Sequence, residues 1–137
     1  MEQDIISYQS IFLDDVKITV IFKENQNYDT LHSLFDKYGF GFYYPKLKTI
    51  IIDGEIFVDS ELDMDDLRFV EAHEIAHLML GHTGGDRYDE DEIDADLAAY
   101  LLLNRKGLST QRLTDTFEER HGIKFTPDLL KKFKDRF

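Results

Sequence analysis

The chain contains no cysteine among its 137 residues. Disulfide bonds, thiolate metal ligands and cysteine nucleophiles are therefore excluded, so any chemistry must use oxygen and nitrogen groups. The chain also lacks an apolar run approaching the roughly 20 residues that a membrane-spanning helix needs. Its first residues, Met1 to Asp4, have neither the basic start nor the apolar run of a signal peptide. We therefore expect a soluble, cytoplasmic protein.

Basic residues are scarce, with 16 Lys and Arg against 28 Asp and Glu, for a net charge of -12. Nucleic-acid binding needs clustered Lys and Arg, so this balance predicts no direct contact with DNA or RNA. The charge is uneven along the chain. Residues 61–96 contain 13 acidic and 2 basic residues, whereas residues 97–137 contain 5 acidic and 9 basic residues.

The length and the ordinary content of apolar residues predict one domain covering residues 1–137. The β-rich run 17–23 predicts a strand, and a shorter strand at 41–44 should stop before Pro45. Residues 49–58 predict a hairpin that turns at Asp53 and Gly54. Apolar spacing and end signals predict helices over 28–38, 63–80, 90–104, 109–121 and 127–137. This order predicts an α+β fold, in which a small sheet containing antiparallel strands packs on a helical half.

The predicted helix at 63–80 contains the strongest chemical signal. Between Phe69 and Leu80 its only polar residues are Glu71, His73, Glu74 and His77. His73 and His77 are four residues apart and share one face of the helix, so both imidazoles can bind one ion, with Glu74 beside them. This HExxH pattern predicts a metal helix in which Glu74 is the catalytic base.

A catalytic zinc site usually has three protein ligands and one open position. The longer pattern HExxHxxGxxH does not supply the third ligand, because Leu80 and Thr83 stand where glycine and histidine would be needed. Glu92 on the following helix is the better candidate, and Glu90 is its main competitor. Asp96, one turn after Glu92, is placed to accept the outer N–H of a ligand histidine.

Two imidazoles and one carboxylate suit a single zinc ion best, although iron(II) can use the same set. An iron(II) oxygenase does not require a glutamate beside the first histidine, so this interpretation is weaker. His82 either ends the metal helix as a surface residue or stabilises a developing oxyanion. Tyr88 is a second candidate for that stabilising contact.

Two segments together are similar to the ImmA/IrrE-type metallopeptidases. They are His73-Glu74-Ile75-Ala76-His77-Leu78-Met79-Leu80-Gly81-His82 and Glu92-Ile93-Asp94-Ala95-Asp96-Leu97. The resemblance spans roughly residues 49–104, and it implies a gluzincin-like zinc site with ligands His73, His77 and Glu92 and base Glu74. It also implies regulatory proteolysis of a protein partner, often a repressor, in bacteria or their phages and mobile elements.

Two functions from different classes fit these features. The first is a zinc-dependent endopeptidase. The alternative is a non-catalytic metal-binding protein whose acidic surface engages a basic partner. Glu74 favours the enzyme, because a structural metal site needs the ligands but not the base. The acidic residues at 86–94 that hold no metal favour a basic substrate in either case.

Overall fold

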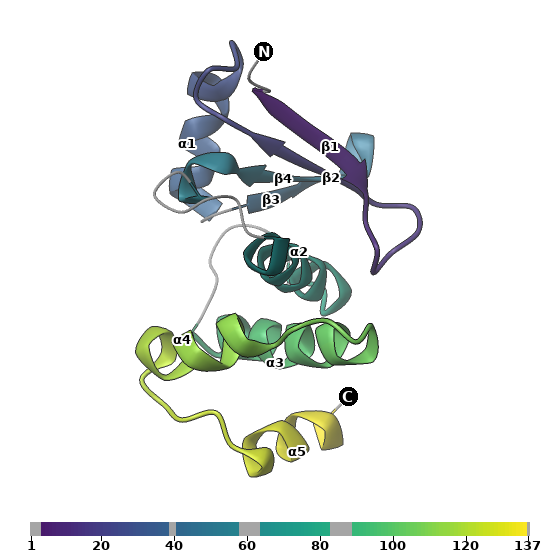
Figure 1. Ribbon diagram of the computed structural model, residues 1–137, viewed down its shortest axis with the longest axis vertical. Coiled ribbons are helices and arrows are strands. Elements are labelled where there is room, and N and C mark those ends of the chain that lie inside the picture. The colour runs from purple at the N-terminus through teal and green to yellow at the C-terminus, as the bar shows by residue number, and fades with distance from the viewer. Residues whose placement is uncertain (1–3, 39–40, 58–63, 83–88, 137) are drawn as a thin grey trace.

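A computed structural model describes residues 4–38, 41–57, 64–82 and 89–136. It contains a four-stranded sheet and five α-helices (Figure 1). The strands are β1 (Ile5–Gln9), β2 (Lys17–Ile21), β3 (Gly41–Tyr44) and β4 (Thr49–Asp53). The helices are α1 (Tyr28–Tyr38), α2 (Met64–Met79), α3 (Asp89–Arg105), α4 (Gln111–His121) and α5 (Pro127–Arg136), and short 3-10 helices cover Pro45–Leu47 and Gly54–Phe57. The predicted α+β class is confirmed.

The sheet is mixed, with strand order β1-β2-β4-β3. The central strands β2 and β4 run parallel, with Ile18 opposite Ile50 and Val20 opposite Ile52, while β1 and β3 pair antiparallel at the two edges. These four central side chains are fully buried. The alternation of the apolar residues therefore fixes which face of the sheet forms the core.

The predicted hairpin over 49–58 is wrong. Residues Thr49–Asp53 form β4, but the chain then enters a 3-10 helix at Gly54–Phe57 instead of turning back. The Asp53 carboxylate accepts a hydrogen bond from the Glu55 amide at 3.0 Å, which starts this helical turn. Gly54 is needed for packing, since a Cβ at this position would lie 2.6 Å from the Phe22 ring. The Asp-Gly pair therefore supports a tight contact and not a hairpin turn.

Strand β1 was not predicted. It lies at the edge of the sheet, where none of its side chains is fully buried. Its residues alternate between exposed and half-buried, so no run of buried apolar side chains distinguishes it. The predicted helices agree with the observed ones to within about two residues at each end, as expected for helix boundaries. Gly81 and Gly122 end α2 and α4 with φ of +75° and +73°, a conformation that glycine adopts without a Cβ penalty.

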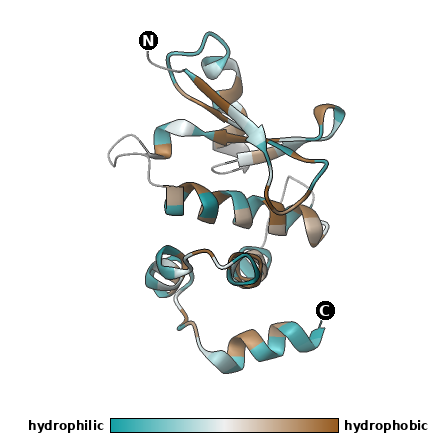
Figure 2. Ribbon diagram, turned by 45° about the vertical axis from the view of Figure 1, so that its right-hand side comes forward, coloured by the Kyte–Doolittle hydropathy of each residue, from teal (hydrophilic) through white to brown (hydrophobic). Residues whose placement is uncertain are grey.

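Helix α2 lies between the sheet and the pair α3 and α4, and α5 forms the far end of the molecule (Figure 1). Leu67 and Ile75 of α2 pack on the central strands, while Ala72 and Ala76 pack toward α3. Because α2 is buried on two sides, apolar residues occupy nearly every face of this predicted metal helix. Figure 2 shows hydrophobic colour along the strands and a hydrophilic end to α5 near the C-terminus.

The buried residue Glu71 ties the N-terminal segment to α2. Its carboxylate accepts hydrogen bonds from the Tyr8 hydroxyl at 3.0 Å, the Ser10 hydroxyl at 2.9 Å and the Ile11 amide at 3.1 Å. Arg68 adds an ion pair at 2.6 Å. A buried charge is tolerated only when it is paired and hydrogen-bonded in this way. Glu71 therefore has a structural task, two residues before the first HExxH residue, His73.

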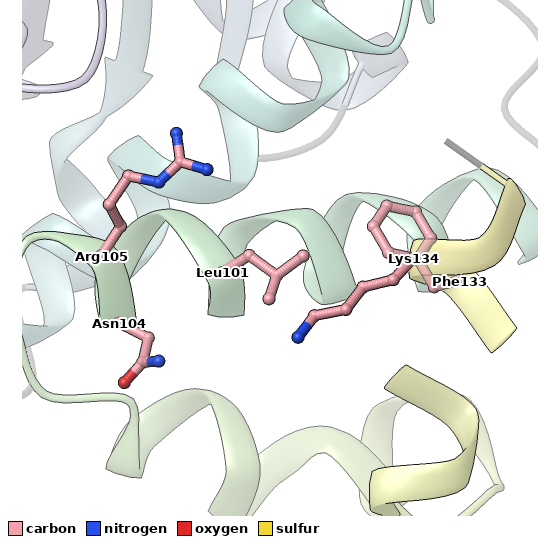
Figure 3. Close-up of a pocket in the computed structure, with 5 residues that line it drawn as sticks. All are labelled: Leu101, Asn104, Arg105, Phe133 and Lys134. Carbon is pink, nitrogen blue, oxygen red and sulfur yellow. The ribbon is translucent and has the colours of Figure 1, made fainter. Parts of the chain in front are cut away.

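A cavity of about 410 Å³ lies between α3 and α5, lined by Leu101, Asn104, Arg105, Phe133 and Lys134 (Figure 3). It contains none of the predicted site residues and lies at the end of α3 opposite Glu92. No helix within the described ranges is long and apolar enough to cross a membrane.

Candidate metal centre

Helices α2 and α3 bring His73, His77 and Glu92 together. Nε2 of His73 lies 3.1 Å from Nε2 of His77 and 3.0 Å from Oε2 of Glu92. Nε2 of His77 lies 3.3 Å from the same Glu92 oxygen. Three potential ligand atoms from two helices thus converge on one point.

The close approach of α2 and α3 depends on small residues. Ala72 and Ala76 on α2 and Ala95 and Ala99 on α3 are completely buried in one shared cluster. Ala95 and Ala99 follow Glu92 by three and seven residues, so they lie on the same helical face as that carboxylate. Larger side chains at these positions would separate the helices and move Glu92 away from the histidines.

The spacing of the three atoms fits a tetrahedral zinc ion. With metal–ligand bonds of about 2.0–2.1 Å, tetrahedral geometry puts neighbouring ligand atoms about 3.3–3.4 Å apart. The observed separations of 3.0, 3.1 and 3.3 Å come close to that requirement. The donor set, two neutral imidazoles and one carboxylate, is also one that zinc accepts. The residues present therefore fit a metal ion.

The electrostatics of this site also favour a positive charge. Burial of the His73 imidazole opposes its protonation, but hydrogen bonds to Asp96 and Glu92 and their negative charges raise its pKa from 6.5 to about 10. Partial burial of Glu92 opposes its ionisation, but hydrogen bonds to the two histidines hold its pKa well below the usual range. In the metal-free protein, protonated His73 therefore supplies the positive charge that a bound metal ion would otherwise supply.

This protonation predicts that zinc binding releases a proton. His73 must be neutral to bind a metal, so at pH 7 roughly one proton should leave for each zinc ion bound, and zinc affinity should rise as the pH rises toward 10. In metal-free protein, a rise in pH has the opposite kind of effect, because it lowers the stability of the fold. Because the folded pKa is the higher one, His73 stabilises the fold below pH 6.5, and this contribution is lost as the pH rises through about 10. Calorimetric titration in buffers of different ionisation enthalpy measures the protons released, and a heat independent of the buffer would contradict the prediction.

The outer nitrogen of His73 also has a partner. Nδ1 of His73 donates to Oδ1 of Asp96 at 2.7 Å, and Asp96 is completely buried. Two residues of α4 reach the other oxygen of this carboxylate: Arg120 donates to Oδ2, and His121 donates to it at 2.5 Å. Burial opposes ionisation of Asp96, but these hydrogen bonds and charges lower its pKa. Sequence reasoning pointed to Asp96 but missed Arg120 and His121, because no pattern links α4 to the HExxH helix.

His82 contacts His77, the second histidine of the converging group. Its Nδ1 lies 2.9 Å from Nδ1 of His77, and its Nε2 lies 3.4 Å from the Asp91 carboxylate. This places His82 behind His77, on the side away from Glu92. Glu90 is exposed and does not belong to the converging group of described residues. Tyr88 lies outside the described residues.

Glu74 is buried, with 5% of its surface exposed, and lies under the edge strand β3. A Cβ on Gly41 of β3 would come within 3.3 Å of the Glu74 carboxyl carbon, so the strand passes directly over this side chain. The charge of Glu74 also contributes to the raised pKa of His73. A buried carboxylate that lies against a sheet edge and acts electrostatically on His73 is suited to move a proton near this point.

Comparison with known proteins gives one family. The family model Peptidase_M78, described as the IrrE N-terminal-like domain, matches residues 13–133. No curated protein and no solved structure matches the chain significantly. The matched segment includes all the residues that converge at the site, from Gly41 of β3 to His121 of α4.

Proposed function

Because the chain belongs to the peptidase family of IrrE N-terminal-like domains, we propose that it is a zinc-dependent endopeptidase of the HExxH type. The observation that carries this proposal is the convergence of His73, His77 and Glu92 within hydrogen-bonding distance of one another. These residues would hold one zinc ion, and Glu74 would be the catalytic base. Residues 1–137 would form a single zincin-like domain.

A bound zinc ion supplies two effects, a lowered pKa for water in its open position and polarisation of a substrate carbonyl. The protein supplies the rest. Glu74 accepts a proton from the attacking water and later donates it to the leaving amine nitrogen. Its buried position under β3 keeps the carboxylate away from bulk solvent. Asp96 holds the ring of His73 in one orientation through its Nδ1 hydrogen bond.

The substrate backbone would pair with β3. Residues 55–57 belong to a 3-10 helix and therefore offer no strand edge for this pairing. Strand β3 is an edge of the sheet, and its neighbour within the described residues is β4. Because Gly41 of β3 lies against Glu74, an extended peptide added along this edge would bring its carbonyl groups to the site.

The proposed substrate is a protein with basic residues near the cleaved bond. Asp89 and Glu90 are exposed in the first turn of α3, which also contains the proposed ligand Glu92. Neither residue belongs to the group that could hold a metal, so both are available to attract a basic segment. By family resemblance, a repressor-type protein partner fits this role.

Removal of the metal should abolish cleavage. We expect purified protein to cut members of a peptide library, to lose this activity after dialysis against a chelator and to regain it with added zinc. Mass spectrometry of the new termini measures the cleavage, and enrichment of Lys or Arg near the cut bond measures the substrate preference. Protein that binds zinc but cuts neither peptides nor proteins would instead support the non-catalytic function.

A further inference from the structure

We infer that Arg120 and His121 of α4 are positioning residues for the metal centre, acting on His73 through Asp96. The two oxygens of Asp96 have separate partners. Oδ1 accepts from Nδ1 of His73 at 2.7 Å, while Oδ2 accepts from Arg120 and from Nε2 of His121 at 2.5 Å. Helix α4 therefore fixes the carboxylate, and the carboxylate fixes the histidine ring. This inference rests on the proposed metal site.

The burial of Asp96 makes the α4 contacts necessary. The Asp96 side chain is fully buried, and those of His121 and Arg120 are 8% and 31% exposed. A buried carboxylate without compensating donors either takes up a proton or turns toward another partner. Either change would weaken its hydrogen bond to His73 and free the ring to rotate.

The donors on α4 are themselves held in place. The ring of His121 packs against buried Phe117, with 4.6 Å between the ring centroids. The guanidinium of Arg120 lies 5.1 Å from the centre of the Phe69 ring, and its Nε donates to the Thr116 hydroxyl at 3.0 Å. Phe69 precedes His73 by one turn of α2, so Arg120 contacts both the outer carboxylate and the helix that carries the ligand.

Two other ion pairs of α4 and α5 do not involve Asp96. Arg112 of α4 pairs with Asp66 at 2.5 Å, and Arg136 of α5 pairs with Asp94 at 2.5 Å. Both arginine side chains are more than half exposed, and neither acid contacts a proposed ligand in the described interactions. They attach helices to one another, so they provide matched controls for the Asp96 contacts.

The test compares zinc affinity and ligand geometry in single variants. His121→Phe keeps an aromatic ring against Phe117 but removes the donor, and Arg120→Gln removes the charge. His121→Gln places an amide nitrogen near the position of Nε2 and restores a donor. Arg112→Gln breaks an ion pair of the same helix away from Asp96. Zinc dissociation constants come from competition with a chelating dye, and the visible absorption of cobalt-loaded protein reports the ligand geometry.

We expect His121→Phe and Arg120→Gln each to weaken zinc binding by roughly 10- to 100-fold, the usual cost of losing an outer partner, and to change the cobalt spectrum. His121→Gln should recover most of the affinity. Arg112→Gln should lower the thermal unfolding midpoint but keep the affinity and spectrum of the parent. Circular dichroism identifies folded variants, and if one donor variant does not fold, the other decides the result.

Parent affinity and spectrum in both folded donor variants would overturn this inference and leave the proposed function intact. Equal losses of zinc affinity in Arg112→Gln and in the donor variants would also overturn it, because α4 would then act only through stability. A parent protein that binds no zinc would instead refute the proposed function. The two failures are therefore distinguishable.

Discussion

Glu74→Gln should slow peptide cleavage by at least roughly 100-fold while the protein still binds zinc. An amide cannot accept the proton of the attacking water, and loss of a general base typically reduces the rate by roughly 10²- to 10⁴-fold. Glutamine has nearly the same shape as glutamate, so the packing of this buried side chain under Gly41 should be kept. Cleavage of a peptide substrate, measured beside the zinc content of the same sample, checks both parts of the prediction.

Glu71→Gln is the matched control. Glu71 is also a buried glutamate of α2, but its carboxylate binds Tyr8, Ser10 and Arg68 and does not belong to the converging ligand group. We expect Glu71→Gln to reduce the free energy of unfolding and to leave the cleavage rate of folded protein near that of the parent. Equal cleavage by Glu74→Gln and the parent would remove Glu74 from the proposed mechanism.

Glu92→Ala should lose zinc, whereas Glu90→Ala should keep it. The Glu92 carboxylate lies 3.0 and 3.3 Å from the two histidine nitrogens, while Glu90, two residues earlier on the same helix, is exposed. Loss of a direct ligand should weaken binding by more than the roughly 10- to 100-fold cost of losing an outer partner. Competition with a chelating dye measures the zinc affinity of each variant.

This pair of variants also controls for charge. Each removes one negative charge from the first turn of α3, so a general electrostatic effect would weaken zinc binding equally in both. Zinc loss in Glu90→Ala with retention in Glu92→Ala would move the third ligand by two residues. It would also mean that the orientation of α3 differs from the one described.

The helical half and the central part of the site could be predicted because they depend on local spacing. The separation of His73 and His77 puts both on one helical face, and the interval between Glu92 and Asp96 does the same on α3. The structure places all four side chains together. The prediction of the hairpin at Asp53 and Gly54 failed because turn residues were interpreted without their packing partner Phe22.

The contacts behind the proposed ligands could not be predicted, because they join residues that are distant in the sequence. Arg120 and His121 meet Asp96 only after α4 has folded onto α3, a contact that no periodicity encodes. The contact of His82 with His77, which the turn at Gly81 allows, was not predicted either, and the role of His82 toward an oxyanion stays a prediction.

The uneven charge of the chain was a partial signal for these contacts. The acidic region 61–96 and the basic region 97–137 form several of their ion pairs with each other, including those of Asp66 with Arg112, Asp94 with Arg136 and Asp96 with Arg120. Part of the negative charge therefore attaches α4 and α5 to α2 and α3, the helices that carry the candidate metal site. The exposed acids Asp89 and Glu90 remain as the candidates for attracting a basic substrate.

Parallel measurement of zinc content and peptide cleavage in the parent protein and in Glu74→Gln tests the central claim most directly. The proposed function predicts one zinc ion per chain in both proteins and cleavage by Glu74→Gln that is at least roughly 100-fold slower than by the parent, with parent activity lost on chelation and restored by zinc. A parent protein without zinc, or cleavage by Glu74→Gln at the rate of the parent, would contradict it.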